Sequence, residues 1–190
     1  MSKNIVIINN YDSFTYNLHQ FFASIGECSV FRNDEITLEQ LKNKKMTHLV
    51  ISPGPGRPED SKVSIEAVEF FKDKVPILGV CLGMQLMAYL NGGKIVKHLP
   101  VHGRTEKIFH VNSGIHSGMA PGFKAARYNS LCVTDIDETK LEITARGESG
   151  FIMGLRDKKH PLFEGVQYHP ESFLTENGTK ILSNFINKGC

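Results

Sequence analysis

The fold of this chain is decided by residues 75–86, which read VPILGVCLGMQL. The first half of this stretch is apolar and partly β-branched, as in a strand buried on both faces. The residues after the cysteine are rich in Leu, Met and Gln as far as Asn91, which favours a helix. Cys81 lies at the junction, between Gly79 and Gly83. The two glycines permit a tight strand-to-helix turn that presents the cysteine at one edge of a sheet.

Two interpretations of Cys81 are open at this point. The unpaired N–H groups and the dipole at the start of a helix favour a thiolate, so Cys81 is a candidate nucleophile. A buried structural cysteine is the alternative, because free cysteines are among the most buried residues. The G-x-C-x-G pattern is too short to decide between the two.

Length and composition restrict the class of protein. The 190 residues predict a single domain, 1–190, and a composition with 41% hydrophobic and 22% charged residues is typical of a globular protein. A net charge of +2 disfavours nucleic-acid binding. We expect no membrane span, because no apolar run approaches about 18 residues. The 4 cysteines lack zinc-type spacing, so we expect no metal and a reducing, cytoplasmic location.

Apolar runs alternate with helical patterns in the first half of the chain. Asp12 or Ser13 is expected to cap a helix that ends near Ile25. Strands are predicted at residues 5–8, 29–31 and 48–51, and further helices after Thr37 and over residues 61–72. Because alternating strands and helices build parallel sheets covered on both faces, the sequence predicts an α/β fold with three layers (αβα) and a central, mostly parallel sheet.

The pattern changes after Gly93 to shorter apolar runs. Alternation such as Leu141, Ile143 and Ala145 predicts half-buried antiparallel strands joined by turns. Such strands are predicted at residues 94–96, 107–111, 131–133, 141–145, 151–155 and 163–168. A closing helix is predicted over residues 179–187. We therefore expect additional antiparallel strands in the C-terminal half.

Residues 52–58, SPGPGRP, form a loop directly after one of the predicted strands. Its prolines fix the backbone and its glycines expose their N–H groups, which suits a fixed donor near an anion. The loop lacks the G-K-[ST] of a phosphate-binding loop. Because the carboxyl ends of neighbouring parallel strands open onto one edge, this loop is expected near Cys81. A rigid surface turn is the alternative.

His169 and Glu171 follow the last predicted strand. With Cys81 they would supply a thiol, an imidazole that takes its proton, and a carboxylate that orients the imidazole. Each also has an ordinary interpretation, since a single histidine is more often a structural residue and a glutamate two positions away is more often solvated. The spacing alone leaves the triad a hypothesis.

Three separated motifs together resemble the class I (triad) glutamine amidotransferases: GVCLGMQ at 79–85, SPGPG at 52–56 and GVQYHPES at 165–172. The motifs NYDSFTYN at 10–17 and HGR at 102–104 narrow the resemblance to the small-subunit type shared by anthranilate synthase and aminodeoxychorismate synthase. The likeness covers about the whole chain. The resemblance identifies Cys81, His169 and Glu171 as the expected catalytic residues.

The resemblance implies roles for particular residues. Cys81 would attack the amide carbon of L-glutamine, His169 would transfer protons, and Glu171 would hold the imidazole. The backbone N–H groups of Gly56 and Leu82 would form the oxyanion hole. The expected glutamine-binding residues are Gly54, Pro55, Gly56, Leu82, Gln85, Ser130 and Leu131. Asn129 departs from the histidine of many relatives, which leaves the role of its side chain open.

The resemblance also implies a partner. The chain would act as a subunit that passes ammonia to a larger, chorismate-using synthase, and it would need no cofactor of its own. The expected interface residues are Tyr11, Asp12, Ser13, His102, Gly103 and Arg104. The sequence does not separate the anthranilate pathway from the aminodeoxychorismate pathway. Two other functions remain as alternatives: a non-catalytic, flavodoxin-like binding module, and another Cys-His-Glu hydrolase such as a γ-glutamyl hydrolase.

Overall fold

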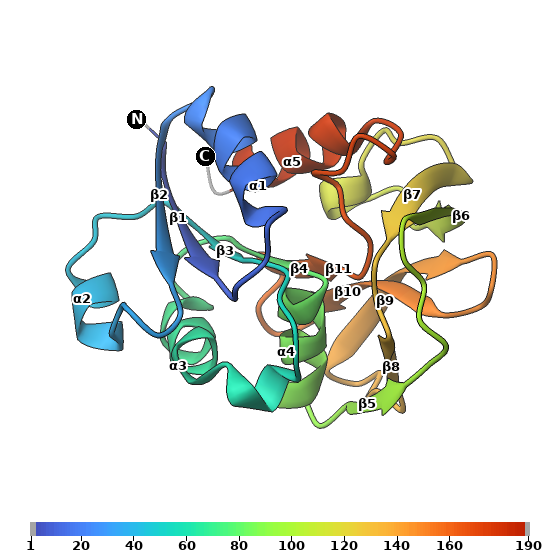
Figure 1. Cartoon of the computed structure of the whole chain (residues 1–190), viewed down its shortest axis with the longest axis horizontal. Coiled ribbons are helices and arrows are strands. Elements are labelled where there is room, and N and C mark those ends of the chain that lie inside the picture. The colour runs from blue at the N-terminus through green and yellow to red at the C-terminus, as the bar shows by residue number, and fades with distance from the viewer. Residues whose placement is uncertain (1–2, 189–190) are drawn as a thin grey trace.

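A mixed sheet of nine strands runs through the computed structural model, which describes residues 3–188 (Figure 1). The strand order is β2-β1-β3-β4-β11-β10-β9-β6-β7, parallel from β2 to β11 and antiparallel from there on. Strands β5 and β8 pair separately as an antiparallel ribbon. The strands are β1 (Asn4–Asn9), β2 (Glu27–Arg32), β3 (His48–Ile51), β4 (Ile77–Val80), β5 (Lys94–Lys97), β6 (Arg104–His110), β7 (Phe123–Arg127), β8 (Leu131–Thr134), β9 (Leu141–Gly147), β10 (Ile152–Asp157) and β11 (Phe163–Val166).

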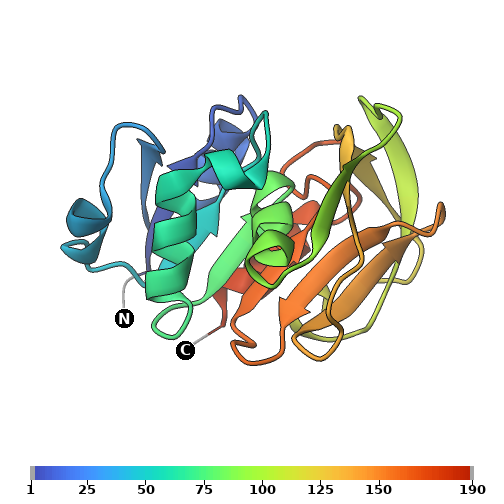
Figure 2. The ribbon, with the colours of Figure 1, turned by 90° about the horizontal axis from the view of Figure 1, so that it is seen from below.

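Helices cover both faces of the parallel part of the sheet. The α-helices are α1 (Thr15–Ala23), α2 (Leu38–Lys42), α3 (Lys62–Phe71), α4 (Leu82–Leu90) and α5 (Gly178–Ile186), with short 3-10 helices η1 (Pro58–Asp60) and η2 (Gly114–His116). Figure 1 shows α1 and α5 above the sheet and α3 and α4 below it, and Figure 2 shows α3 and α4 side by side from below. The predicted three-layer α/β fold is confirmed, with antiparallel strands in the C-terminal half. The prediction that residues 163–168 form one of these antiparallel strands is wrong in part, because β11 pairs parallel with β4 and ends at Val166.

Alternate residues of the same strand fill the two halves of the core. In β1, Ile7 packs in one cluster with Leu18 and Phe22 of α1. Its neighbour Ile8 belongs to the cluster on the other face, which includes Met84 of α4. This division follows from the two-residue period of a strand, and it explains why β1 is continuously apolar.

The turn between β4 and α4 has the geometry that its glycines allow. Cys81 adopts φ +53° and ψ −99°, a backbone region that residues other than glycine rarely occupy. A Cβ on Gly79 would lie 2.5 Å from the carbonyl oxygen of Gly83, and a Cβ on Gly83 would lie 2.5 Å from that of Ile51. The close packing predicted at this turn is therefore present.

The start of α1 differs from the sequence-based expectation. Phe14 is the N-cap residue, no side chain caps the helix, and the prediction of an Asp12 or Ser13 cap is wrong. The Asp12 carboxylate instead accepts a hydrogen bond from the Phe14 N–H at 2.8 Å. Asp12 thus orders the turn before the helix rather than the helix itself.

Two strands of the antiparallel part also differ from expectation. Strand β7 is absent from the sequence prediction, and it pairs with β6 so that Arg127 lies opposite Arg104. Strand β6 begins at Arg104, so one of the expected interface residues lies in a strand and His102 and Gly103 precede it. Within residues 3–188, no helix is long and apolar enough to cross a membrane.

Candidate active site

Cys81 lies beside the carboxyl end of β11. The two strands β4 and β11 run parallel, with Val80 opposite Val166, and the Cys81 N–H donates to the Val166 carbonyl oxygen at 2.8 Å. Residues that follow Val166 therefore emerge next to the thiol. The Cys81 residue is 7% exposed, so it is shielded without being sealed from solvent.

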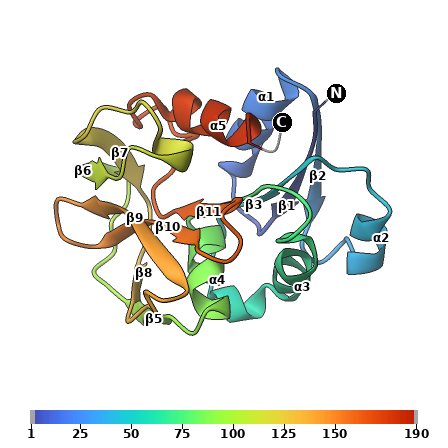
Figure 3. The same cartoon turned by 180° about the vertical axis from the view of Figure 1, so that it is seen from behind.

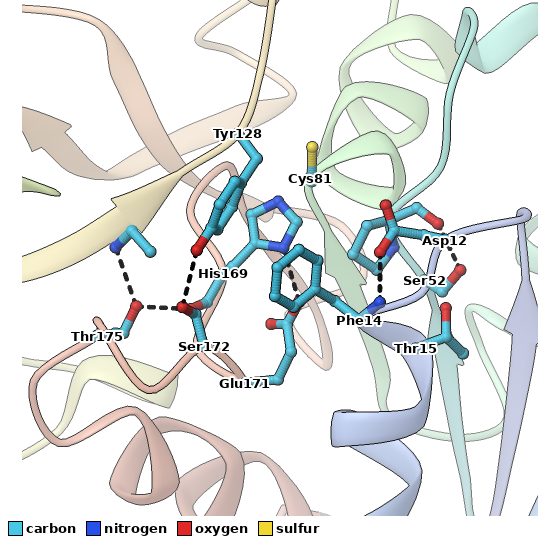
Figure 4. A network of polar contacts seen from close by, with 12 residues as sticks. Asp12, Phe14, Thr15, Ser52, Cys81, Tyr128, His169, Glu171, Ser172 and Thr175 are labelled. Atoms are coloured by element: carbon cyan, nitrogen blue, oxygen red, sulfur yellow. Dashed lines mark hydrogen bonds and ion pairs between the residues drawn. The ribbon is translucent and has the colours of Figure 1, made fainter. Parts of the chain in front are cut away.

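His169 and Glu171 form the pair that the sequence predicts, and Figure 4 shows the imidazole beside Cys81. The Nδ1 atom of His169 lies 2.7 Å from Oε1 of Glu171. The backbone of His169 is held on both sides, because its N–H donates to the Ala126 carbonyl oxygen at 3.1 Å and its carbonyl accepts from the Thr175 hydroxyl at 2.6 Å. The imidazole is thus fixed in position and orientation.

Electrostatics favour a protonated His169. Burial by itself opposes the charge, but the Cys81 side chain and the Glu171 carboxylate outweigh it and raise the pKa of His169 well above its usual range. Within the described part of the chain, Nε2 of His169 makes no hydrogen bond. Because Nδ1 is committed to Glu171, Nε2 is the nitrogen left to exchange a proton at the sulfur.

Two aromatic side chains enclose His169. The ring of Tyr128 meets the imidazole edge to face at 5.0 Å between centroids, and the ring of Phe14 does so at 5.5 Å. Phe14 and Tyr128 together form an aromatic wall beside His169. The Tyr128 hydroxyl shares a hydrogen bond with the Ser172 hydroxyl at 3.2 Å, which ties this wall to the segment carrying His169 (Figure 4). The rings limit water around the imidazole and fix its plane.

The loop over residues 52–58 packs directly on the turn that carries Cys81. A Cβ on Gly54 would lie 2.4 Å from the Asn10 carbonyl oxygen and 2.9 Å from Cδ2 of Leu82, so only glycine fits between them. The Asn10 N–H donates to the Ser52 hydroxyl at 2.8 Å, which ties the loop to the end of β1. Pro55 and Gly56 lie at its exposed tip, where Gly56 has φ +82°.

The donors expected for an oxyanion lie on these two segments. Leu82 is the first residue of α4, so its N–H has no partner within the helix. Gly56 belongs to the loop whose Gly54 packs on Leu82. The structure therefore brings together the loop and the helix start that the sequence assigns to one site.

Gln85 reaches from α4 across the site to β8. Its Nε2 donates to the Leu131 carbonyl oxygen at 3.3 Å and to Oε1 of Gln167 at 3.0 Å. Asn129 is also buried, and its side chain donates to the same Leu131 carbonyl at 2.8 Å. The side chain of Asn129 thus orders the segment that holds Leu131. Ser130 is exposed, and its carbonyl accepts from the His98 N–H at 2.8 Å.

The residues expected at a partner interface belong to two segments that both reach Tyr128. His102 stacks edge to face on Tyr128 at 5.3 Å, and Phe14, directly after Asp12 and Ser13, stacks on the same tyrosine at 4.7 Å. Tyr11 is 50% exposed, with its hydroxyl donating to Asp34. Gly103 and Arg104 are exposed as well. Within residues 3–188, no group of three or more His, Cys, Asp or Glu side chains is placed to hold a metal ion.

Comparison with known proteins decides the family. The family model described as "Glutamine amidotransferase class-I" matches residues 6–188, which include every element of the site. This chain belongs to the class I glutamine amidotransferases. As in that family, the expected chemistry of this amidotransferase is the release of ammonia from glutamine.

Relatives of this amidotransferase carry consistent names. The chain is 51% identical over 97% of its length to the "Bifunctional protein TrpGD" of Thermotoga maritima, of which it spans only 32%. It is 45% identical to "Anthranilate synthase component 2" of Cyanophora paradoxa, covering 96% of this chain and 98% of that one. It is also 45% identical to "Aminodeoxychorismate synthase component 2" of Klebsiella aerogenes, covering 97% and 100%.

A solved structure supports the fold of the amidotransferase. A protein from Thermoplasma acidophilum, described as a candidate component of GMP synthase, superposes with a TM-score of 0.84 over 98% of this chain and 93% of that one. The sequence identity is only 22%, so this likeness concerns the fold.

Sequence reasoning missed three residues of the amidotransferase site. Phe14 lies within the NYDSFTYN motif and Tyr128 directly precedes Asn129, but no local pattern indicates that their rings meet beside His169. Gln167 precedes His169 by two positions in the GVQYHPES motif, and its Nε2 donates to Sγ of Cys81 at 3.4 Å. The available signal for Gln167 is a polar residue at the end of a buried strand, on the same side as His169.

Proposed function

We propose that this amidotransferase hydrolyses L-glutamine through a thioester on Cys81 and delivers the ammonia to a larger, chorismate-using synthase subunit. The observation that carries this proposal is the 2.7 Å contact of His169 with Glu171 beside a cysteine held at positive φ. A nucleophile, its proton carrier and the group that orients the carrier are the minimum that amide cleavage through a thioester requires.

The first half-reaction breaks the carbon–nitrogen bond of the glutamine side chain. Sγ of Cys81 attacks the amide carbon, and the oxygen becomes negative. Nε2 of His169 gives a proton to the departing nitrogen, which leaves as ammonia, and the carbonyl re-forms as a thioester. Glu171 holds the positive imidazole through Nδ1 before this transfer. The high pKa of His169 suits a histidine that starts protonated.

The second half-reaction consumes water. The now neutral His169 takes a proton from a water molecule, whose oxygen attacks the thioester carbon, and the carbon–sulfur bond breaks. Glutamate leaves and the Cys81 sulfur returns to its starting state, with the proton on His169. In both steps the N–H groups of Gly56 and Leu82 are proposed to receive the negative oxygen, a contribution of about 2.7–4 kcal/mol per donor in hydrolases.

Glutamine recognition is assigned to the groups that surround this point. The proposed contacts are the loop residues Gly54 and Pro55, the side chain of Gln85, and the backbone of Ser130 and Leu131. Gln85 uses both protons of its amide within the protein, which leaves its oxygen as an acceptor for the substrate.

The proposed partner surface is the rim formed by Tyr11, Asp12 and Ser13 on one side and His102, Gly103 and Arg104 on the other. His102 and Phe14, the residue after Ser13, both stack on Tyr128 beside His169. Relatives of the chain are named as second components of two synthases. Leu99, which is 80% exposed, and Phe173, which is 90% exposed, add apolar area of the kind that protein interfaces bury. A cytoplasmic location is part of the proposal, because a thiol nucleophile needs a reducing compartment.

A glutamine-analogue chloroketone tests the nucleophile. Labelling of Cys81 that disappears in Cys81→Ser supports the proposal, and absence of labelling with the synthase present contradicts it. The complex containing Cys81→Ser should form product from added ammonium but not from glutamine. The product formed with each candidate synthase, anthranilate or aminodeoxychorismate, identifies the partner.

A further inference from the structure

A path of side-chain amides connects a backbone carbonyl to the sulfur of Cys81. Gln85 Nε2 donates to the Leu131 carbonyl oxygen at 3.3 Å and to Oε1 of Gln167 at 3.0 Å. Nε2 of Gln167 then donates to Sγ of Cys81 at 3.4 Å. The path therefore ends at the atom that carries out the proposed chemistry.

The direction of every bond along this path is determined. A backbone carbonyl can only accept, so Gln85 has to turn its NH₂ group toward Leu131. The same NH₂ group also donates to Gln167, so Gln167 has to present its side-chain oxygen as the acceptor. The NH₂ group of Gln167 is then left for the sulfur. Exchanging oxygen and nitrogen in either amide would place two acceptors or two donors against each other in a buried site, which is costly.

Burial and backbone contacts hold Gln167 in this place. Its side chain is almost fully buried, with the residue 1% exposed, and its N–H donates to the Met153 carbonyl oxygen at 3.0 Å. The next side chain, Tyr168, points away and pairs with Nε2 of His116 at 2.7 Å. Gln167 and His169 both face Cys81, Gln167 through its hydrogen bond to the sulfur and His169 with its imidazole beside it (Figure 4).

We propose that Gln167 takes part in the reaction. Its side-chain amide donates a hydrogen bond to the Cys81 sulfur and holds that sulfur as a thiolate aimed at the substrate. Gln85 is the positioning residue that keeps this donor turned toward the sulfur. The inference rests on Cys81 being the nucleophile. A hydrogen bond from an amide to a charged acceptor is stronger than one to a neutral acceptor, so the bond favours the thiolate over the thiol. When the thioester forms the charge is lost, and the donor favours return to the thiolate in the second step.

Two variants separate this role from simple packing. Gln167→Met keeps the length and removes both polar groups, whereas Gln167→Glu keeps an acceptor for Gln85 and replaces the donor to sulfur. The matched control is Gln40→Glu, the same chemical change on α2, where the side-chain oxygen of residue 40 accepts from the Thr37 N–H and a carboxylate does so equally well. Thermal melting establishes that each variant is folded.

The decisive readout is the rate of Cys81 alkylation by iodoacetamide from pH 5 to 10, followed by mass spectrometry of the Cys81 peptide. We expect the pH midpoint to rise by about one unit or more in both Gln167 variants, which is about tenfold slower labelling below the midpoint. With the synthase present, glutamine-dependent kcat should fall about tenfold or more, and KM should rise more in Gln167→Met than in Gln167→Glu. Gln40→Glu should match the parent in both measurements.

The proposal is overturned if the folded Gln167→Met protein keeps the pH midpoint and kcat of the parent. If that variant does not fold, the same criterion is applied to Gln167→Glu. Failure of the proposed function looks different, because then the unaltered chain itself would release no ammonia from glutamine and the chloroketone would not label Cys81.

Discussion

The Nδ1 atom of His169 lies 2.7 Å from Oε1 of Glu171, and both side chains are almost completely buried. The backbone on each side of this pair is anchored, by Ala126 before it and by Thr175 after it. The imidazole therefore has one orientation available, with Nε2 directed away from Glu171. This fixed orientation is the property that a proton carrier between sulfur and nitrogen needs.

Replacing the carboxylate without changing its shape should disable the proton carrier. In Glu171→Gln the amide can donate to Nδ1 and stabilise the wrong tautomer, so we expect glutamine-dependent kcat to fall by about 10²- to 10⁴-fold. A coupled assay for glutamate measures this. The control is Glu66→Gln on the exposed surface of α3, which should keep full activity. More than half of the parental kcat in Glu171→Gln would contradict the proposed triad.

Adding one methyl group in the first turn of α4 should destabilise the protein. In Gly83→Ala the new Cβ would lie 2.5 Å from the Ile51 carbonyl oxygen, and we expect a loss of about 1–3 kcal/mol in the free energy of unfolding. Urea unfolding measures it. Gly150→Ala is the comparison, because that glycine has positive φ but open space around it, so it tests backbone strain alone. An equal or smaller loss at Gly83 would be evidence against the close packing.

Stability should depend on pH through His116. Burial, followed by the charges of His110, Arg156 and Lys188, lowers the pKa of His116 from 6.5 to about 3. Between pH 6.5 and about 3, His116 therefore binds a proton in the unfolded chain but stays neutral in the folded protein. The contribution of neutral His116 is complete above about pH 6.5 and is lost as the pH falls toward 3.

The variant His116→Gln tests this dependence. Between pH 6.5 and about 4.5, before most carboxyl groups titrate, the unfolding free energy of the parent should fall more steeply than that of the variant, by up to about 1.4 kcal/mol per pH unit. Urea titrations at several pH values give both slopes. Parallel slopes would show that His116 is protonated in the folded protein.

Reversing one charge at the rim should weaken the complex with the synthase. Arg104 is exposed at the start of β6, next to His102 on the aromatic wall. We expect Arg104→Glu to reduce affinity for the synthase about tenfold or more, mainly through association at low salt, while Cys81 alkylation stays unchanged. Surface plasmon resonance against the synthase measures this. Lys45→Glu, an exposed change just after α2, should leave the affinity intact.

Much of the site could be predicted because its residues follow strands. Cys81 comes directly after β4, and Gln167, His169 and Glu171 come after β11, so the parallel pairing of these two strands brings them together. Their polar character at the end of apolar runs is visible in the sequence. What the sequence could not supply is the pairing itself, because 86 residues separate Cys81 from Gln167.

The misses have physical reasons as well. Strand β7 reads FKAAR, and its small alanines give a weak apolar pattern, so its existence depends on the pairing with β6. The expected start of α1 is too early because Asp12 is a good capping residue, but its carboxylate binds the Phe14 N–H in the preceding turn. The contact of Phe14 with Tyr128 joins two loops that no local period relates.

The place of β11 in the sheet has a consequence for how the protein is made. This strand lies between β4 and β10, so a late segment of the chain occupies an inner position of the sheet. Figure 3 shows β11 near the middle of the molecule. During synthesis Cys81 leaves the ribosome long before β11 does, and until β11 inserts, the cysteine lacks Gln167, His169 and Glu171. An incomplete chain therefore carries the Cys81 thiol without the side chains that would surround it in the folded site. On the proposed mechanism, the sheet is completed and the triad is assembled around Cys81 in one event, so a nascent chain would be unable to hydrolyse glutamine before it has folded.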